Sequence, residues 1–192
     1  MIKYIFPSPI YFSKIQNDNS ALSINIKKLL TIKSDPLKSG IDGYRIDIDQ
    51  DLVNNSQLGI GELLEKIQKE IFNYCNQLSI GQQKIIQSWI NINPTHSYNR
   101  KHTHANSTIS GAYYINIPAD SNSKFVFHRS REFSDYRWNT MSTNDTEELR
   151  SELNYLPNTS DLILFPSYLD HEVLPNQSLD DRISISFNAI PV

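Results

Sequence analysis

The chain has 192 residues, a mass of 22.1 kDa, a formal net charge of −3 and one cysteine, Cys75. This length suits one domain with a hydrophobic core, and its 39% hydrophobic and 20% charged residues are typical of a folded protein, so we predict a single domain over 1–192. The slight negative charge disfavours a nucleic-acid partner, the single cysteine excludes an intramolecular disulfide scaffold, and no apolar run is long enough for a bilayer, so we predict a soluble cytoplasmic protein without a membrane partner.

The N-terminal part, residues 1–83, is predicted to supply strands and a helix that pack on a β core. Pro7 and Pro9 favour an extended start, and the period-two alternation of residues 44–48 is typical of a half-buried strand. Apolar residues then recur at three- and four-residue steps, which predicts a helix near 59–78 that stops at Gly81.

The C-terminal part, residues 84–192, is rich in β-branched and aromatic residues. Strands are predicted over 84–93, 107–117, 124–128, 161–167 and 181–190. In the last of these, Ile183, Ile185 and Phe187 share one face, and the other face is polar: Arg182, Ser184, Ser186 and Asn188. A small barrel or sandwich can point such a polar face into a pocket. The predicted fold is mainly β with a buttressing helix, an antiparallel sandwich or barrel.

Residues 129–160 form a long polar segment without clear periodicity. Loops of this length are usually functional, so we predict an insertion that acts as a lid over a site. Tyr136 and Trp138 are its aromatic residues, which either grip a substrate or fasten the loop to the barrel.

Three histidines are candidates for a metal site. His102 and His104 are two residues apart in a polar segment before a strand, and His171 follows an apolar strand that breaks at Pro166. Side chains two apart in an extended chain point the same way, so the first two can converge, and three imidazoles suit a transition metal with open positions. The alternative is solvated loop histidines. His96 and His128 have no comparable setting and are not proposed as ligands.

The segments WININPTHSYNRKHTH, STISGAYYINIP, LILFPSYLDHEVLPN and RISISFN, in this order, resemble the Fe(II)- and 2-oxoglutarate-dependent oxygenases, in particular a bacterial and phage branch near the prolyl-hydroxylase-like group. The resemblance covers about 84–190. It implies a double-stranded β-helix (a jelly-roll or cupin-like barrel), Fe(II) bound by His102 and His171, and 2-oxoglutarate as co-substrate. It also implies that Arg182, with Ser184, holds the distal carboxylate of 2-oxoglutarate, and that weaker co-substrate contacts come from Tyr113 or Tyr114 and from Asn91 and Asn93.

The chain departs from this family at one ligand position. The wider superfamily has a carboxylate two residues after the first histidine, whereas this chain has His104. His104 is therefore either a third ligand or leaves a site of two histidines and water. Asp170 is a poorer substitute, because adjacent strand residues point to opposite faces.

The resemblance implies a dioxygenase that hydroxylates an unidentified substrate, which is a protein side chain, an amino acid or a small metabolite. One alternative is a cupin-type metal protein, although ANSTIS lacks the glutamate expected after its histidine pair. The other is a non-enzymatic β-sandwich binding or structural module with incidental histidines. The sequence does not indicate an oligomeric state.

Overall fold

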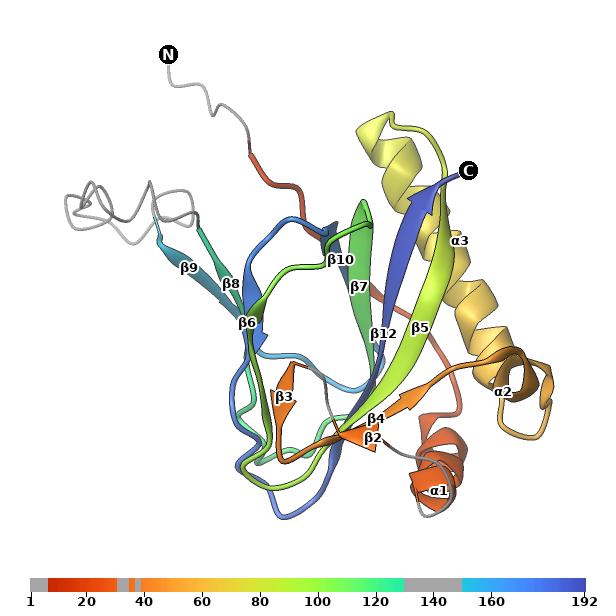
Figure 1. Ribbon diagram of the computed structural model, residues 1–192, viewed down its shortest axis with the longest axis vertical. Coiled ribbons are helices and arrows are strands. Elements are labelled where there is room, and N and C mark those ends of the chain that lie inside the picture. The colour runs from red at the N-terminus through yellow and green to blue at the C-terminus, as the bar shows by residue number, and fades with distance from the viewer. Residues whose placement is uncertain (1–6, 31–34, 37–38, 130–149) are drawn as a thin grey trace.

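The computed structural model describes residues 7–30, 35–36, 39–129 and 150–192, and its strands form two antiparallel sheets that face each other (Figure 1). The larger sheet has, in spatial order, β1 (Tyr11–Lys14), β10 (Asp161–Pro166), β7 (Ile109–Asn116), β12 (Arg182–Pro191), β5 (Gln83–Asn93), β4 (Tyr44–Asp47) and β2 (Asp35–Pro36). The smaller sheet has β3 (Gly40–Ile41), β6 (Tyr98–His102), β11 (His171–Val173), β8 (Phe125–His128) and β9 (Glu152–Tyr155). The predicted mainly β architecture is confirmed.

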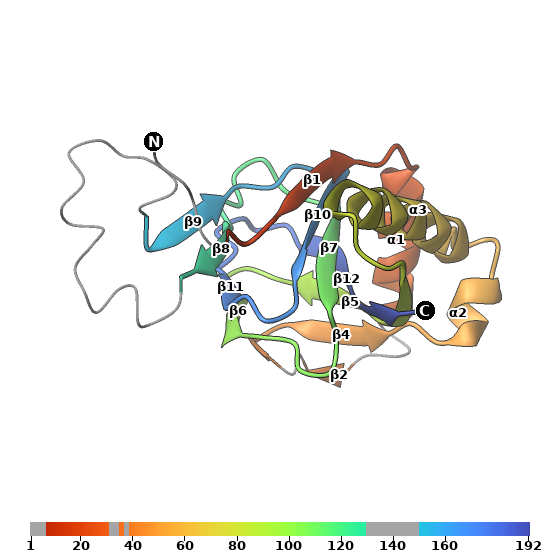
Figure 2. The same cartoon turned by 90° about the horizontal axis from the view of Figure 1, so that it is seen from above.

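Helices cover the outer face of the larger sheet, as the view from above shows (Figure 2). They are α1 (Asn19–Leu30), α2 (Gln50–Asn54) and α3 (Ile60–Leu78). The helix predicted near 59–78 is confirmed as α3, which ends at Leu78, but the residue that closes it is Ser79 and not Gly81. Ser79 takes the left-handed conformation, with φ of 54°, and its N–H donates to the carbonyls of Cys75 and Asn76. A residue in this conformation closes the last turn, so the helix stops before the glycine is reached.

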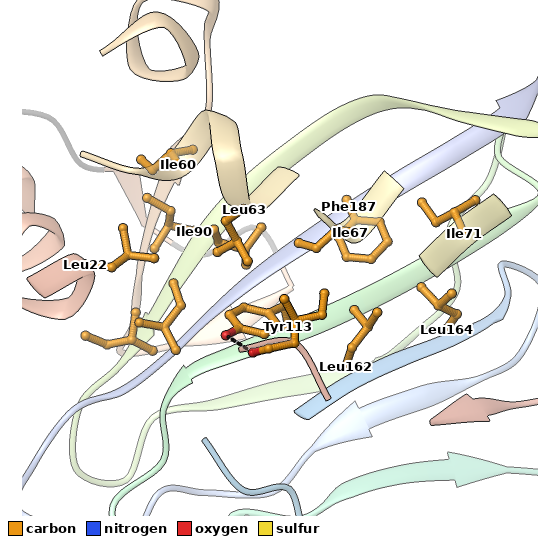
Figure 3. Packing of buried hydrophobic residues seen from close by; sticks show 14 of the residues in the cluster. Leu22, Ile60, Leu63, Ile67, Ile71, Ile90, Tyr113, Leu162, Leu164 and Phe187 are labelled. Atoms are coloured by element: carbon orange, nitrogen blue, oxygen red, sulfur yellow. Dashed lines mark hydrogen bonds between the residues drawn. The ribbon is translucent and has the colours of Figure 1, made fainter. Parts of the chain in front are cut away.

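The main hydrophobic core lies between these helices and the larger sheet (Figure 3). Leu63, Ile67 and Ile71 of α3 pack against outward-facing residues of the sheet, because their spacing puts them on one helix face. Gly111 of β7 lets the ring of Phe187 and the backbone of Ile163 pack directly against its Cα. A Cβ there would meet the Phe187 ring at 2.5 Å and the carbonyl oxygen of Ile163 at 2.7 Å.

A second, smaller cluster lies between the two sheets and contains Ala112, Tyr114, Phe125, Phe127, Ile163, Phe165 and Val173. Strand alternation separates the two clusters. In β12, Ile183, Ile185 and Phe187 join the helix-side core, as their shared face predicts. The intervening Arg182, Ser184 and Ser186 therefore face the space between the sheets, where they line a cavity. The predicted direction of this polar face is confirmed.

The five strands predicted in the β-rich part correspond to β5, β7, β8, β10 and β12, and the strand predicted at 44–48 to β4. Sequence periodicity did not identify α1, β6, β9 or β11. Within the predicted loop 129–160, residues 152–155 form β9, which pairs with β8. Residues 130–149, with Tyr136 and Trp138, lie outside the described residues. No helix among the described residues is long and apolar enough to cross a membrane.

Candidate metal and co-substrate site

Two of the predicted histidines meet through strand pairing. β6 ends at His102 and β11 begins at His171, and the antiparallel register sets these residues directly opposite each other. Directly opposed residues of paired strands have their Cβ atoms about 5 Å apart. The ring centroids of the two imidazoles are 4.4 Å apart. A pair separated by more than sixty positions in sequence is thus brought together by one backbone register.

His104 completes a cluster of three. It lies two residues beyond the end of β6, and its ring centroid is 5.0 Å from those of both His102 and His171. One ligand atom from each histidine can be chosen so that all three lie within 4.8 Å of one another. The structure therefore brings all three predicted ligands to one point.

The backbone fixes the ring orientation of His102 and His171 in the same way. Nδ1 of His102 is 2.6 Å from the carbonyl oxygen of Arg100, and Nδ1 of His171 is 2.8 Å from that of Leu169. Since a carbonyl oxygen only accepts, each Nδ1 carries the proton and leaves the Nε2 lone pair free for a metal. Among the described residues, no such partner contacts the ring of His104.

Burial keeps the three imidazoles of the cluster in their neutral form. Phe125 stacks on His171 with centroids 5.2 Å apart, and Phe165 meets the same ring at 4.8 Å. Burial, followed by the charge of His102, lowers the pKa of His171 to about 3, and the same causes lower the pKa of His104 to about 4. Burial also lowers the pKa of His102. Neutral imidazole is the form that binds metals, so the donors are available at neutral pH.

Arg182 is buried in the same cavity, and its charge has no counter-ion among the described residues. Its Nη1 donates to Oδ1 of Asn93 at 3.2 Å, and its guanidinium lies 5.2 Å from the ring centroid of Tyr114. Nε of Arg182 and the hydroxyl of Tyr114 are both buried without a hydrogen-bond partner in the described chain. Buried polar atoms are normally paired, so two neighbouring unpaired donors indicate a place for an anionic acceptor.

These groups line one cavity between the two sheets. Its wall includes the three histidines and Arg182, with Asn91, Ser184 and Ser186 on the polar side and Phe125, Phe165 and Val173 on the apolar side. The predicted residues Asn91 and Ser184 thus face the cavity. A larger hollow of about 570 Å³ lies between α2, α3 and β5, and its described lining has no histidine.

The structure does not place Tyr113 in this cavity. Tyr113 belongs to the helix-side core (Figure 3). Its hydroxyl oxygen lies 3.1 Å from the carbonyl oxygen of Ile15 and 3.0 Å from Oδ1 of Asn19. Adjacent strand residues face opposite ways, so Tyr114 is the tyrosine that reaches Arg182. Asn93 acts through Arg182, whose guanidinium it contacts.

The two remaining histidines lie outside the cluster. His96 is exposed, and its φ of 65° reflects a left-handed turn. The ring of His128 lies between two glutamates, with Nδ1 3.2 Å from a carboxylate oxygen of Glu152 and Nε2 2.9 Å from one of Glu172.

Trp89 is a site residue that the sequence analysis missed. Its ring lies 5.8 Å from that of His104, and the guanidinium of Arg45 covers it at 4.2 Å. The period-two series of Trp89, Asn91 and Asn93 in β5 was the available signal, because all three share one strand face.

The donor set fits a mononuclear metal together with a dicarboxylate. Three imidazoles leave coordination positions open on a transition metal such as Fe(II). The unpaired Nε of Arg182, which lines the same cavity, and the neighbouring hydroxyl of Tyr114 are suited to bind a carboxylate.

Comparison with known proteins identifies a family and supports the fold described above. A family model described as "Putative 2OG-Fe(II) oxygenase" matches residues 87–188, more than half of the chain. A Pseudomonas putida prolyl-4-hydroxylase has 12% identity and a TM-score of 0.66, over 95% of this chain and 92% of that chain. A Trichoplax adhaerens prolyl hydroxylase, solved with a hypoxia inducible factor peptide fragment, has 11% identity and a TM-score of 0.66, over 95% and 83%. The viral collagen prolyl hydroxylase of Paramecium Bursaria Chlorella virus-1, in a 2OG complex, has 15% identity and a TM-score of 0.58, over 95% and 97%. A search of curated proteins found no match.

Proposed function

The chain belongs to the 2OG-Fe(II) oxygenase family and is an Fe(II)- and 2-oxoglutarate-dependent oxygenase, and we propose that it hydroxylates its substrate at a three-histidine iron centre. The observation that carries the proposal is the juxtaposition of His102, His104 and His171 with the buried Arg182 in one cavity. This arrangement supports the oxygenase assignment over a cupin-type metal protein and a non-enzymatic module.

In this proposal the three imidazoles would hold Fe(II), which would activate dioxygen, the oxidant of the reaction, when bound. His102 and His171 are oriented by their bonds to the Arg100 and Leu169 carbonyls, so that their Nε2 lone pairs face the metal. Phe125 and Phe165 exclude water from the His171 side. The protein thus supplies fixed neutral donors and a partly dry environment.

Arg182 and Tyr114 are proposed to bind the distal carboxylate of 2-oxoglutarate. Asn93 fixes one end of the guanidinium and leaves Nε available to the co-substrate. The hydroxyl of Tyr114, whose pKa is raised by burial, stays protonated and can donate. Asn91 and Ser184 add polar contacts along the cavity wall.

His104 is proposed as the third ligand. A neutral imidazole in place of a carboxylate raises the net charge of the centre by one, so the site should favour anionic co-ligands more strongly than a site with a carboxylate.

The substrate is proposed to be a protein side chain, an amino acid or a small metabolite. A similar structure from Trichoplax adhaerens was solved with a peptide fragment, which supports a peptide as one of these candidates. The proposal keeps residues 1–192 as one oxygenase unit. It also keeps the cytoplasmic location, since the free Cys75 needs no oxidising compartment.

Metal binding and co-substrate turnover test the proposal together. The protein has two tryptophans, Trp89 and Trp138, so a Trp138→Phe background leaves the fluorescence of Trp89 as a reporter beside His104. We expect a paramagnetic divalent metal to quench this emission, and Fe(II), 2-oxoglutarate and oxygen to yield succinate.

His102→Ala and His171→Ala should abolish both the quenching and succinate formation. The matched control is His96→Asn, which alters an exposed histidine outside the cluster and keeps a residue that tolerates positive φ. Retention of metal and turnover by both alanine variants would refute the proposed site.

A further inference from the structure

His104 is the one histidine of the cluster whose ring has no orienting hydrogen bond among the described residues. Metal-bound imidazoles normally donate their second N–H to a carbonyl, carboxylate or water, which fixes the ring. His102 and His171 have such bonds, whereas His104 follows the end of β6 and lies in a loop. Its ring position must therefore be determined by its backbone and by packing on Trp89.

The backbone of His104 is attached to Ser167, which follows β10. The N–H of His104 donates to the carbonyl of Ser167 at 3.0 Å, and the N–H of Ser167 donates to the carbonyl of Thr108 at 3.1 Å. The hydroxyl of Ser107 lies 3.2 Å from the carbonyl oxygen of His104 and 3.0 Å from the hydroxyl of Ser167. The loop bearing His104 is thus held on both sides of the histidine.

This attachment continues into the sheet through buried hydroxyls. The hydroxyls of Ser167 and Ser110 are 2.7 Å apart, and that of Ser110 donates to Oδ1 of Asn188 at 2.8 Å. Ser110 and Ser167 are each only 1% exposed. Each hydroxyl has one proton. Ser110 donates to Asn188 and Ser167 donates to Ser110, which leaves the single proton of Ser107 to the hydroxyl of Ser167 or to the carbonyl of His104. Chains ordered in one direction strengthen each of their bonds.

This series of hydrogen-bonded hydroxyls ends on β12, the strand that carries Arg182. Asn188 belongs to β12, an even number of residues after Arg182, and so lies on the same strand face. The loop that carries the third proposed metal ligand is therefore linked to the strand that carries Arg182.

We propose that the hydroxyl chain Ser107–Ser167–Ser110–Asn188 is a positioning device for His104, replacing the ring-to-carbonyl bonds that orient His102 and His171. This inference rests on the proposed metal site. The four residues are positioning residues, since they act through the His104 backbone.

The test uses Co(II), whose visible absorption reports the number and strength of nitrogen donors. Ser110→Ala breaks the buried link, and Ser107→Ala breaks the partly exposed link next to His104 should the first variant fold poorly. The matched control is Ser123→Ala, because Ser123 is equally buried and also loses one hydroxyl bond, to the carbonyl of Leu174 at 2.6 Å, outside the chain.

We expect Ser110→Ala and Ser107→Ala to weaken Co(II) binding by about 10- to 100-fold, as removal of outer partners of metal ligands does. Their absorption bands should move towards that of His104→Ala, whereas Ser123→Ala should keep the wild-type affinity and spectrum. Adding Ser110→Ala to His104→Ala should cause no further loss, because the chain acts through His104.

Wild-type affinity and spectrum in both serine variants would overturn the inference, as would equal losses in Ser123→Ala. An unchanged spectrum in His104→Ala would also overturn it, while leaving the sites at His102 and His171 intact. Failure of the wild-type protein to bind Co(II) would instead refute the proposed metal site.

Discussion

Replacing Arg182 with methionine should separate the effect of Arg182 on the stability of the free protein from its contribution to 2-oxoglutarate binding. Arg182 is 2% exposed, and within the described chain no carboxylate pairs with its guanidinium. Burial lowers the pKa of Arg182, which means that its charge is unfavourable in this place. Methionine has similar length and no charge. We therefore expect the free protein with Arg182→Met to unfold at the wild-type temperature or above it, the lost bond to Asn93 being offset.

With 2-oxoglutarate bound, we expect the wild-type protein to be more stable than Arg182→Met. Wild-type protein loaded with Mn(II), at 2-oxoglutarate equal to ~100 times its Kd, gains about 2.7 kcal/mol, which is roughly 5–10 °C in Tm for a chain of this size. Loss of a buried charge-assisted pair costs about 2–5 kcal/mol, or roughly 30-fold or more in Kd. The same concentration should then stabilise Arg182→Met by less than ~1 kcal/mol.

Thermal unfolding with Mn(II), with and without 2-oxoglutarate, measures both effects. Succinate can serve as a weaker ligand, because it keeps both carboxylates but lacks the keto oxygen of 2-oxoglutarate. Arg182→Lys is the charge-preserving comparison and should rescue binding only in part, since lysine lacks the planar fork. An unstable free variant that still gains the full 5–10 °C would show that Arg182 stabilises the fold and does not bind the co-substrate, and would refute the reasoning.

Three further predictions follow from individual side chains. His104→Asp should bind Fe(II) more tightly than His104→Ala in the Trp89 quenching assay, because a carboxylate is a ligand and Arg45 is close enough to lower the pKa at this position; equal affinities would exclude residue 104 from the metal. Tyr114→Phe should raise the Tm of the free protein and raise the KM for 2-oxoglutarate, because its buried hydroxyl is unpaired. Metal-free protein should lose stability as the pH falls from 7 to 4. The pKa values of His171 and His104 are lowered from 6.5 to about 3 and about 4, so in this range the unfolded chain binds protons that the folded chain does not. In thermal scans, His104→Gln should lose less stability over the same pH range.

Much of the β architecture follows from local sequence pattern. Period-two alternation in RISISFN determines which side of β12 faces the helices and which faces the cavity, because strand side chains alternate strictly. The helical spacing of Leu63, Ile67 and Ile71 likewise determines the face of α3 that packs on the sheet. Neither inference needs a distant contact.

Sequence periodicity did not predict the short strands that carry two of the histidines. β6 and β11 contain the polar sequences Tyr98–His102 and His171–Val173, which have too few apolar residues to show a period. They are strands because each pairs with a neighbour that is remote in sequence. Tertiary pairing, and not propensity, therefore puts His102 opposite His171.

The choice between adjacent residues also needed the tertiary structure. The sequence nominated Tyr113 or Tyr114, and only the register of β7 against β12 decides that Tyr114 lies beside Arg182. Sequence likewise supplied His104 as a candidate, but its distance from the other imidazoles depends on a loop held by Ser167. Residue types and strand faces are local properties of the chain, whereas convergence on one point arises from the pairing of distant segments, and only the folded structure shows it.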